Sequence, residues 1–213
     1  MKLYGYWRST TSYRVRAALN LKKIAYDQVS VDLVAGEQRG ADYLGMNPGG
    51  GVPTLVLDDG TALTQSMAIL DYVDAMWPTP QLIPSEPLHR ARVLAAAHAI
   101  ALDIHPVNNL RVVTLLKERF GASQDDGQAW MCHWMAEGFR AVEAMVDDAV
   151  PFAFGTAPDL ADLCIVAQAY NARRWGLDLA PFPKVVRIED NCLALPEIAA
   201  AHPDRQPDAK GVA

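Results

Sequence analysis

A short run of basic and hydroxyl residues near the N-terminus is the first place in this sequence where chemistry could occur. Arg8-Ser9-Thr10-Thr11 follows a run rich in β-favouring residues, and the apolar residues of 13–21 then recur at helical spacing. This order of strand, loop and helix places hydroxyls and unpaired N–H groups at a positive helix end, where a thiolate or carboxylate is stabilised. Ser and Thr are also the preferred helix caps, so capping alone is the simpler interpretation of the pattern.

Two further polar features follow along the chain. Val52-Pro53 comes after the loop Asn47–Gly51, and a cis bond here would turn the Val52 backbone outward as a pair of hydrogen-bonding groups. Gln65-Ser66 places polar side chains and first-turn N–H groups at another helix start, which can also hold a carboxylate. Three such features in one small domain indicate a peptide-like ligand that lies across it.

These features are positioned by a predicted βαβ, loop, ββα order in the first eighty residues. The strands are expected over 2–7, 25–33, 53–57 and 61–63, with a tight turn at Asp58-Asp59-Gly60, and the helices over 13–21 and 65–73. We therefore predict an α/β domain over residues 1–78.

The rest of the chain has a different character. Four prolines among residues 77–87 predict a linker over 79–87, because proline can neither propagate a helix nor sit inside a sheet. From residue 88 the apolar positions keep helical spacing, which predicts an all-helical domain over 88–213. Asp159 and Asp162 resemble a capping box at the start of a buried helix. The tail after His202 is rich in proline and charge and is expected to lie extended on the surface.

Composition excludes several classes of protein. Among 213 residues 51% are hydrophobic and 21% charged, which is typical of a folded chain. The net charge of −6 predicts no binding to nucleic acid or to an anionic membrane. No signal-peptide run or 18-residue apolar window is present, so a cytoplasmic location is expected. Cys132, Cys164 and Cys192 have no Cys-x-x-Cys spacing, so we predict neither a disulfide framework nor a metal site.

The sequence resembles the zeta class of cytosolic glutathione transferases over nearly its whole length. Residues 8–19 resemble the class signature Ser-Ser-Cys-x-(Trp/His)-Arg-Val-Arg-Ile-Ala-Leu. Further matching positions are Asn47-Pro48, Val52-Pro53-Thr54-Leu55, Gln65-Ser66, Ala161-Asp162-Leu163-Cys164, Asn171-Ala172 and Gln206-Pro207-Asp208. The resemblance implies a thioredoxin-like glutathione-binding domain followed by an all-helical domain that contributes the substrate site.

One departure from the signature concerns the nucleophile. Thr11 stands where the signature has cysteine, while Ser9 keeps its first serine and Thr10 replaces the second. The hydroxyl is kept and the thiol is lost, which leaves glutathione as the only thiol at the site. A thioredoxin-like disulfide oxidoreductase would need Cys-x-x-Cys after the first strand, and residues 9–12 contain no sulfur.

The resemblance implies a glutathione-dependent cis–trans isomerase. The expected reaction converts maleylpyruvate to fumarylpyruvate in gentisate-type aromatic catabolism, by thiolate addition, bond rotation and thiol expulsion. Three alternatives stay open: a maleylacetoacetate isomerase of tyrosine and phenylalanine catabolism, a general glutathione transferase, and a non-catalytic binding module. The alternating polar and apolar faces of 65–73 and 88–120 also predict a homodimer.

Site residues follow from the loops and from the resemblance. We predict Ser9 as the hydroxyl donor to the thiol, Arg8 as the cation beside it, and Thr11 as a third catalytic residue. The predicted glutathione contacts are Ser9, Thr10, Thr11, Gln38, Val52, Pro53, Gln65, Ser66, His105 and Asn109. The predicted ligands of a small dicarboxylate substrate are Arg8, Asn108, Arg111 and Arg174. Arg14 and Arg16 are expected to cover the surface of the first helix or to pair with acids.

Overall fold

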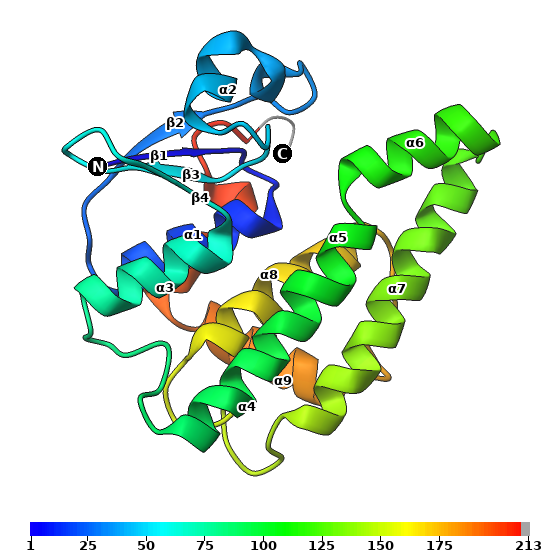
Figure 1. Cartoon of the computed structure of the whole chain (residues 1–213). Helices are drawn as coiled ribbons and strands as arrows, with labels where there is room; N and C mark the ends of the chain where they lie inside the picture. The colour runs from blue at the N-terminus through cyan, green and yellow to red at the C-terminus, as the bar shows by residue number, and fades with distance from the viewer. Residues whose placement is uncertain (210–213) are drawn as a thin grey trace. The chain divides into compact units, whose positions relative to one another are not determined.

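The computed structural model describes residues 1–209, which divide into two compact units (Figure 1). The first unit contains Met1–Leu82 together with the segment that begins at Leu193, and the second contains Ile83–Cys192. The segment from Leu193 thus groups with the α/β unit, whereas the sequence assigned all of 88–213 to the helical domain. The ranges 1–78, 79–87 and 88–213 remain a prediction for folding domains.

A four-stranded mixed sheet forms the centre of the first unit. Its strands are β1 (Lys2–Gly5), β2 (Asp27–Ser30), β3 (Thr54–Val56) and β4 (Ala62–Thr64), in the order β2-β1-β3-β4. β1 pairs with β2 in parallel and with β3 antiparallel, and β3 and β4 form an antiparallel hairpin. Asp59 accepts a hydrogen bond from the Thr61 amide in the turn, and Gly60 takes a positive φ of 87° there. The predicted βαβ unit and hairpin are confirmed.

Helices cover the sheet on both faces. Figure 1 shows α1 (Thr10–Leu21) and α3 (Ser66–Met76) below the sheet and α2 (Ala41–Met46) above it. Fully buried apolar side chains lie between the sheet and helices α1 and α3; they include Leu3, Val15, Leu19, Leu55, Ile69 and Val73. The sequence did not predict α2 or the 3₁₀ turn Glu37–Arg39 before it. With six residues and no side-chain cap at Gly40, α2 carries little helical signal.

Helices α1 and α3 of the α/β unit are joined by a buried ion pair. Lys22 Nζ, at the end of α1, lies 2.7 Å from Asp74 Oδ1 in α3. The same ammonium donates to the carbonyls of Trp77 and Pro80, at 2.5 and 2.6 Å, and Asp74 also accepts from the Leu82 amide. Each polar group is satisfied, so the pair fixes the path of the chain out of α3.

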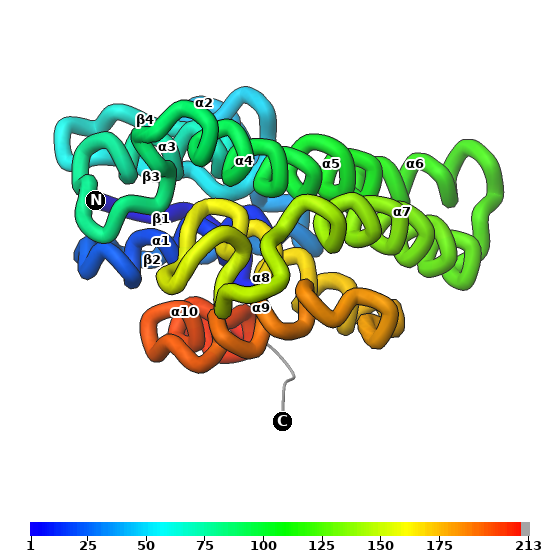
Figure 2. The backbone as a smooth tube through the Cα atoms, turned by 90° about the horizontal axis from the view of Figure 1, so that it is seen from below, coloured from blue at the N-terminus to red at the C-terminus, as the bar shows by residue number. Residues whose placement is uncertain are grey.

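The second unit is helical in all of its described secondary structure, as predicted. Its helices are α4 (Pro87–His98), α5 (His105–Val107), α6 (Leu110–Phe120), α7 (Gln124–Met145), α8 (Leu160–Arg174) and α9 (Pro183–Leu193). Figure 2 shows α4 and α5 as one continuous rod beside α7. A π-helical turn, Ala99–Ile104, joins α4 to α5 just before Pro106, which has no N–H to continue the α-helical pattern.

The π-helical turn approaches α7 closely at a glycine. A Cβ placed on Gly138 would lie 2.2 Å from the Ile104 side chain, so only glycine leaves room for this contact. Ile104 is buried there.

The start of α8 confirms the predicted capping box. Asp159 accepts from the amides of Ala161 and Asp162, and Asp162 accepts from the amides of Asp159 and Ala153. Burial, together with the neighbouring Asp159 carboxylate, raises the pKa of Asp162. The two acids therefore begin a buried helix, which is the structural role that the sequence favoured.

The chain after His202 differs from the predicted extended surface tail. Pro203–Arg205 forms a 3₁₀ turn, and Pro203 and Gln206 are buried. Gln206 Nε2 donates to the carbonyls of Ala200 and His202, at 2.9 and 2.8 Å. The prediction was wrong because Gln206 folds the segment back on itself and Asp208 accepts a hydrogen bond from the distant Trp7 amide, and composition indicates neither contact.

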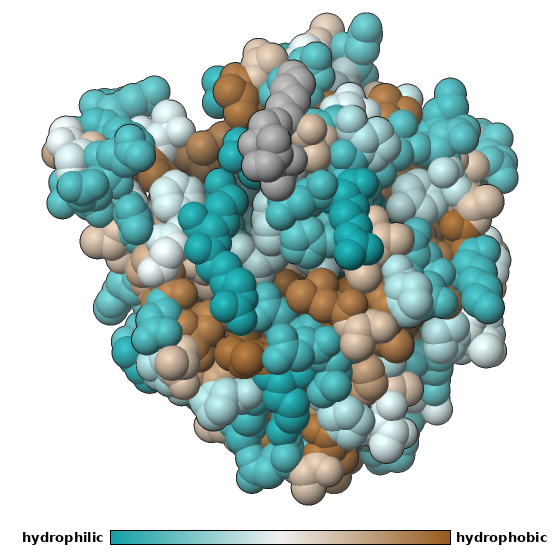
Figure 3. All heavy atoms as spheres, turned by 180° about the vertical axis from the view of Figure 1, so that it is seen from behind, coloured by the Kyte–Doolittle hydropathy of each residue, from teal (hydrophilic) through white to brown (hydrophobic). Residues whose placement is uncertain are grey.

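Hydrophobic side chains on the face displayed in Figure 3 form separate areas between hydrophilic ones. Among residues 1–209, no helix is both long enough and apolar enough to cross a bilayer.

Candidate active site

The hydroxyl of Ser9 lies at the N-terminus of α1. Its oxygen accepts from the Ser12 amide, at 3.2 Å, and lies 2.7 Å from Thr11 Oγ1. Thr11 in turn donates its single hydroxyl proton to the Val52 carbonyl, at 2.8 Å. The Ser9 proton is therefore the one shared between the two hydroxyls, and it can be redirected to a ligand by rotation about one bond.

The same hydrogen bonds bring three predicted site residues together. Ser9, Thr11 and Val52 are connected across 41 residues of sequence through the Thr11–Val52 contact. Thr10, next to them, is a buried residue of the first helical turn. The Val52–Pro53 peptide bond is cis, which confirms the prediction made from the glycine-rich loop.

Two side chains that the sequence did not identify as site residues support this loop. Tyr43 Oη donates to the Gly51 carbonyl at 2.6 Å, and Asn47 Nδ2 donates to the same oxygen at 2.7 Å. Both also contact Thr54 Oγ1, and burial raises the pKa of Tyr43 so that its phenol stays a donor. The position of Asn47 beside Pro48 and three glycines is a sequence signal that could have identified it as a supporting residue. Tyr43 carried no such signal, because it lies in helix α2, which the sequence did not predict.

Gln65 and Ser66 form an unusual helix start. Gln65 has φ 66° and ψ 111°, a conformation that non-glycine residues adopt only where the surroundings impose it. No side chain caps α3, and Ser66 is buried at its first position. The Gln65 side chain makes no capping hydrogen bond to the first turn of α3, and a helix N-terminus of this kind suits a carboxylate.

Gln38 has an acceptor that the protein does not satisfy. The side chain is buried in the turn Glu37–Arg39, and its Oε1 has no hydrogen-bond partner among the described residues. Buried polar atoms are nearly always paired, so this oxygen is suited to an N–H group of a ligand.

Arg8 is held on aromatic rings. Its guanidinium carbon lies 4.7 Å from the centre of the Trp7 ring and 6.0 Å from that of Tyr6, and Nη2 donates to Tyr6 Oη at 3.3 Å. No ion pair of Arg8 occurs within residues 1–209. With Tyr6, Trp7, Ser30, Asp32, Val34, Glu37 and Asp208 it lines a cavity of about 470 Å³. The aromatic rings fix the position of the guanidinium, and the same cavity contains the carboxylates of Asp32, Glu37 and Asp208. The role of Arg8 in binding an anion stays a prediction.

Arg14 and Arg16 differ from their predicted place on the helix surface. Both side chains are only about 1% exposed. Arg16 donates to the carbonyls of Trp7 and Ala201, at 3.0 and 3.1 Å, and Arg14 Nη1 contacts the Met67 sulfur. The expected surface position was wrong because these cations have buried backbone or sulfur partners that helical spacing does not indicate, and the alternative, pairing with acids, stays a prediction.

The remaining predicted site residues lie in the helical unit. His105 begins α5, Asn108 is buried, and Asn109 caps α6 by accepting from the Arg111 amide. Asn108 Nδ2 donates to the Met131 carbonyl, while its Oδ1 has no hydrogen-bond partner among the described residues. These neighbours form one polar turn between α5 and α6, and their ligand roles stay predictions.

Arg174 lies at the end of α8. Its Nη2 donates to Asn171 Oδ1 at 3.1 Å, and its guanidinium carbon lies 4.9 Å from the centre of the Trp175 ring. Like Arg8, it is oriented by an aromatic ring, and its role as a substrate ligand stays a prediction.

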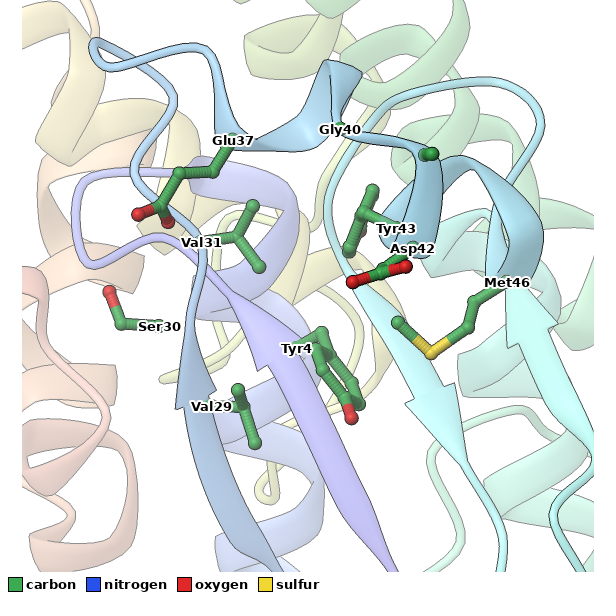
Figure 4. A pocket seen from close by; sticks show the side chains of 10 residues that line it. Tyr4, Val29, Ser30, Val31, Glu37, Gly40, Asp42, Tyr43 and Met46 are labelled. Atoms are coloured by element: carbon green, nitrogen blue, oxygen red, sulfur yellow. The ribbon is translucent and has the colours of Figure 1, made fainter.

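A second cavity of the α/β unit lies between the sheet and α2. Its volume is about 430 Å³, and Figure 4 shows Tyr4, Val29, Tyr43 and Met46 around it. None of the predicted site residues lines it.

Comparisons with known proteins agree with this fold. Residues 1–75 match the family described as glutathione S-transferase, N-terminal domain. The maleylacetoacetate isomerase of Rhizobium meliloti (strain 1021) is 46% identical over 205 residues, 95% of this chain and 96% of that protein. These matches extend the likeness well beyond the N-terminal domain.

Two solved structures are similar over the whole chain. A holo maleylpyruvate isomerase, described as a bacterial glutathione S-transferase in the zeta class, has a TM-score of 0.95 and 38% identity, covering 98% of this chain and 100% of that one. A maleylacetoacetate isomerase from Methylobacterium extorquens AM1, with bound malonate and glutathione, has a TM-score of 0.95 and 41% identity, covering 99% and 100%. The predicted fold is confirmed, and the chain belongs to the zeta class of glutathione transferases.

Proposed function

We propose that this chain is a glutathione-dependent cis–trans isomerase of maleyl keto acids, with maleylpyruvate as the expected substrate and fumarylpyruvate as the product. The observation that carries the proposal is the hydroxyl pair of Ser9 and Thr11 at the start of α1, next to Arg8 and in a loop without cysteine. Relatives named for both maleylacetoacetate and maleylpyruvate support the reaction class.

Three features of the α/β unit fit bound glutathione. The uncapped start of α3 at Gln65-Ser66 suits the carboxylate of the γ-glutamyl end. Val52 presents backbone groups to the cysteinyl unit as an added strand would. The unpaired Gln38 Oε1 suits an N–H group at the other end of the peptide. When bound, glutathione supplies the thiolate that makes the alkene bond temporarily rotatable.

Ser9 stabilises the thiolate form of the bound cosubstrate. A free thiol has a pKa of about 8.5 and is mostly protonated at neutral pH. The Ser9 hydroxyl can donate to sulfur once it turns away from Thr11, and the α1 N-terminus favours negative charge at the same place. Thr11 keeps its bond to the Val52 carbonyl, which holds the loop that receives the peptide.

Arg8 binds negative charge on the diacid substrate. The substrate carries two carboxylates, and its keto oxygen gains negative charge during isomerisation. The Arg8 guanidinium, held over Trp7, can stabilise either group without losing an ion pair first. We assign the other substrate contacts to Asn108, Arg111 and Arg174, and further glutathione contacts to His105 and Asn109, as the resemblance implies.

We also propose a homodimer in the cytoplasm. Exposed apolar side chains on α3, α4 and α6 support a second copy as partner. Three cysteines that form no disulfide, together with the need for reduced glutathione, support a reducing compartment.

One experiment tests the activity and its alternatives. Maleylpyruvate and maleylacetoacetate are each incubated with the purified chain and glutathione, with S-methylglutathione in place of the thiol as the control. We expect loss of substrate absorbance only with the free thiol, a fumaryl product by proton NMR, and no net consumption of glutathione. Stoichiometric consumption would instead identify a conjugating transferase, and faster turnover of maleylacetoacetate would identify the other isomerase.

A further inference from the structure

A carboxylate from the C-terminal segment joins the ends of two strands. Asp208 Oδ2 accepts from the Trp7 amide at 3.2 Å and from Ser30 Oγ at 2.9 Å. Asp208 Oδ1 accepts from Gln28 Nε2 at 3.3 Å. Ser30 is the last paired residue of β2, and Trp7 follows the end of β1. A residue 201 positions away thus determines where the chain goes after β1.

The backbone of Trp7 is held at both its N–H and its carbonyl, by Asp208 of this segment and by Arg16 of α1. While Asp208 binds its N–H, Arg16 Nη2 donates to its carbonyl at 3.0 Å, and Arg16 Nε donates to the Ala201 carbonyl. The segment itself is fixed by Gln206, which donates to the carbonyls of Ala200 and His202. The loop after β1 therefore rests on hydrogen bonds from a distant part of the chain.

Trp7 supports the two predicted catalytic residues that follow it, Arg8 and Ser9. Trp7 is buried, and its ring carries the guanidinium of Arg8 at 4.7 Å. Ser9 follows directly, and its amide donates to the Tyr6 carbonyl at 3.0 Å. Asp208 also lines the cavity that Arg8 enters. A change in the Trp7 peptide must move Arg8 and Ser9 with it.

We propose that Asp208 is a positioning residue for the isomerase reaction, which acts through the Trp7 peptide to fix Arg8 and Ser9. This inference rests on the proposed function. An ionised carboxylate is a strong acceptor for a backbone N–H, so it orders the loop more firmly than water would. Asp208 itself does not bind substrate in this role.

The test compares three variants. In Asp208→Ala the Trp7 amide loses its acceptor, and we expect kcat to fall about tenfold to a hundredfold, the scale of an ångström-sized misplacement. Asp208→Asn keeps one acceptor oxygen for Trp7 but loses the charge that strengthens the bond, so its kcat should lie between those of Asp208→Ala and wild type, roughly threefold to tenfold below wild type. Gln28→Ala removes a different hydrogen bond of Asp208 and should retain nearly full activity. The KM for glutathione should change little in all three, because the predicted peptide-binding groups are untouched.

Two readouts separate positioning from general loss of structure. Asp208→Ala should raise the apparent thiol pKa in the pH profile of kcat/KM, because Ser9 is displaced from sulfur. Hydrogen exchange of a peptide covering 6–9 should become faster in Asp208→Ala and stay slow in Gln28→Ala. Circular dichroism and thermal melting identify any variant that fails to fold, in which case Asp208→Asn carries the comparison.

The proposal fails if Asp208→Ala or, where that variant does not fold, Asp208→Asn keeps the wild-type rate, pH profile and exchange. It also fails if Gln28→Ala loses as much activity as Asp208→Ala, since the cause would then be attachment of the tail rather than the Trp7 bond. An inactive wild-type chain would overturn the proposed function instead, and exchange at 6–9 would still report whether Asp208 orders the loop.

Discussion

The single hydroxyl proton of Ser9 determines how this site can activate a thiol. In Ser9→Ala that proton is lost, so the apparent thiol pKa in the rate profile should rise by about one unit, and the rate at neutral pH should fall for every electrophile alike. Steady-state kinetics across the neutral range, with a diacid and with a neutral electrophile, measures both effects.

Thr11 provides the matched control for Ser9. Thr11→Ser keeps the hydroxyl that donates to the Val52 carbonyl and should behave like wild type, while Thr11→Val loses it and should raise the KM for glutathione. An unshifted pH profile in Ser9→Ala would assign thiolate stabilisation to another group.

The two arginines stacked on aromatic rings separate an isomerase of diacids from a general transferase. If Arg8 and Arg174 bind the substrate's carboxylates, replacement of either by alanine should cost about 1.5–3 kcal/mol of transition-state stabilisation, roughly ten- to a hundredfold in kcat/KM. Glutathione affinity, measured by calorimetry, should hardly change. Full activity of both variants on maleylpyruvate, with a neutral electrophile as the better substrate, would favour the general transferase.

At the scale of elements, two capping boxes in the helical unit differ mainly in burial. Asp159→Ala at the start of α8 should cost about 1 kcal/mol of stability, as the loss of a helix cap usually does. Asp162→Ala should cost about 1–3 kcal/mol, because it leaves the amides of Ala153 and Asp159 buried without an acceptor. Urea unfolding measures both.

The exposed capping box of α7 is the control. Asp126→Ala removes the equivalent N3 carboxylate, but water can replace its bonds to Ser123, so the loss of stability should be smaller than in Asp162→Ala.

The two carboxylates should also differ in how their contribution to stability depends on pH. Burial raises the pKa of Asp162, so its ionisation lowers stability as pH rises above about 4, and the difference in stability between wild type and Asp162→Ala should shrink. The Ser123 hydrogen bonds lower the pKa of Asp126, so its contribution should instead be lost as pH falls. Parallel pH profiles for the two variants would contradict this assignment.

Elements with local signals were predictable from sequence, and those held by distant contacts were not. Periodicity and turn residues were enough for the βαβ unit, the hairpin and the helix start at Asp159. Nothing local marks the burial of Arg16, whose partner Ala201 is 185 residues away. The polar tail was expected on the surface for the same reason, because the Trp7 amide that Asp208 binds lies at the other end of the chain.

In the candidate site, too, features with a local sequence signal were predictable and features held by distant contacts were not. The hydroxyl loop, Val52-Pro53 and Gln65-Ser66 could be located from residue types, whereas the supporting bonds of Tyr43 depend on a short helix with little sequence signal. The roles proposed for Arg174 and the α5–α6 turn come from the resemblance to a family, because composition alone would assign these residues to a solvated helix surface.

At the scale of the whole molecule, apolar side chains on several helices remain exposed in the single chain. Met76 on α3, Leu88 on α4 and Leu102 in the π-helical turn are 56%, 71% and 58% exposed. Large apolar side chains are stabilised when a partner covers them, and a stable dimer interface buries about 1,200–2,000 Å² of accessible surface in total. We therefore expect light scattering to give about twice the chain mass of 23.2 kDa at micromolar concentration.

Substitutions on these helices locate the contact between copies. Leu88→Lys and Leu102→Lys should shift the equilibrium toward monomers by about tenfold or more, because each places an unpaired charge in an apolar contact. Val34→Lys is the matched control, since Val34 is 74% exposed but lies in a loop of the α/β unit. A 23.2 kDa particle for the wild-type chain would exclude the dimer. If Val34→Lys is the only variant that gives monomers, the contact between copies lies at that loop and not on these helices.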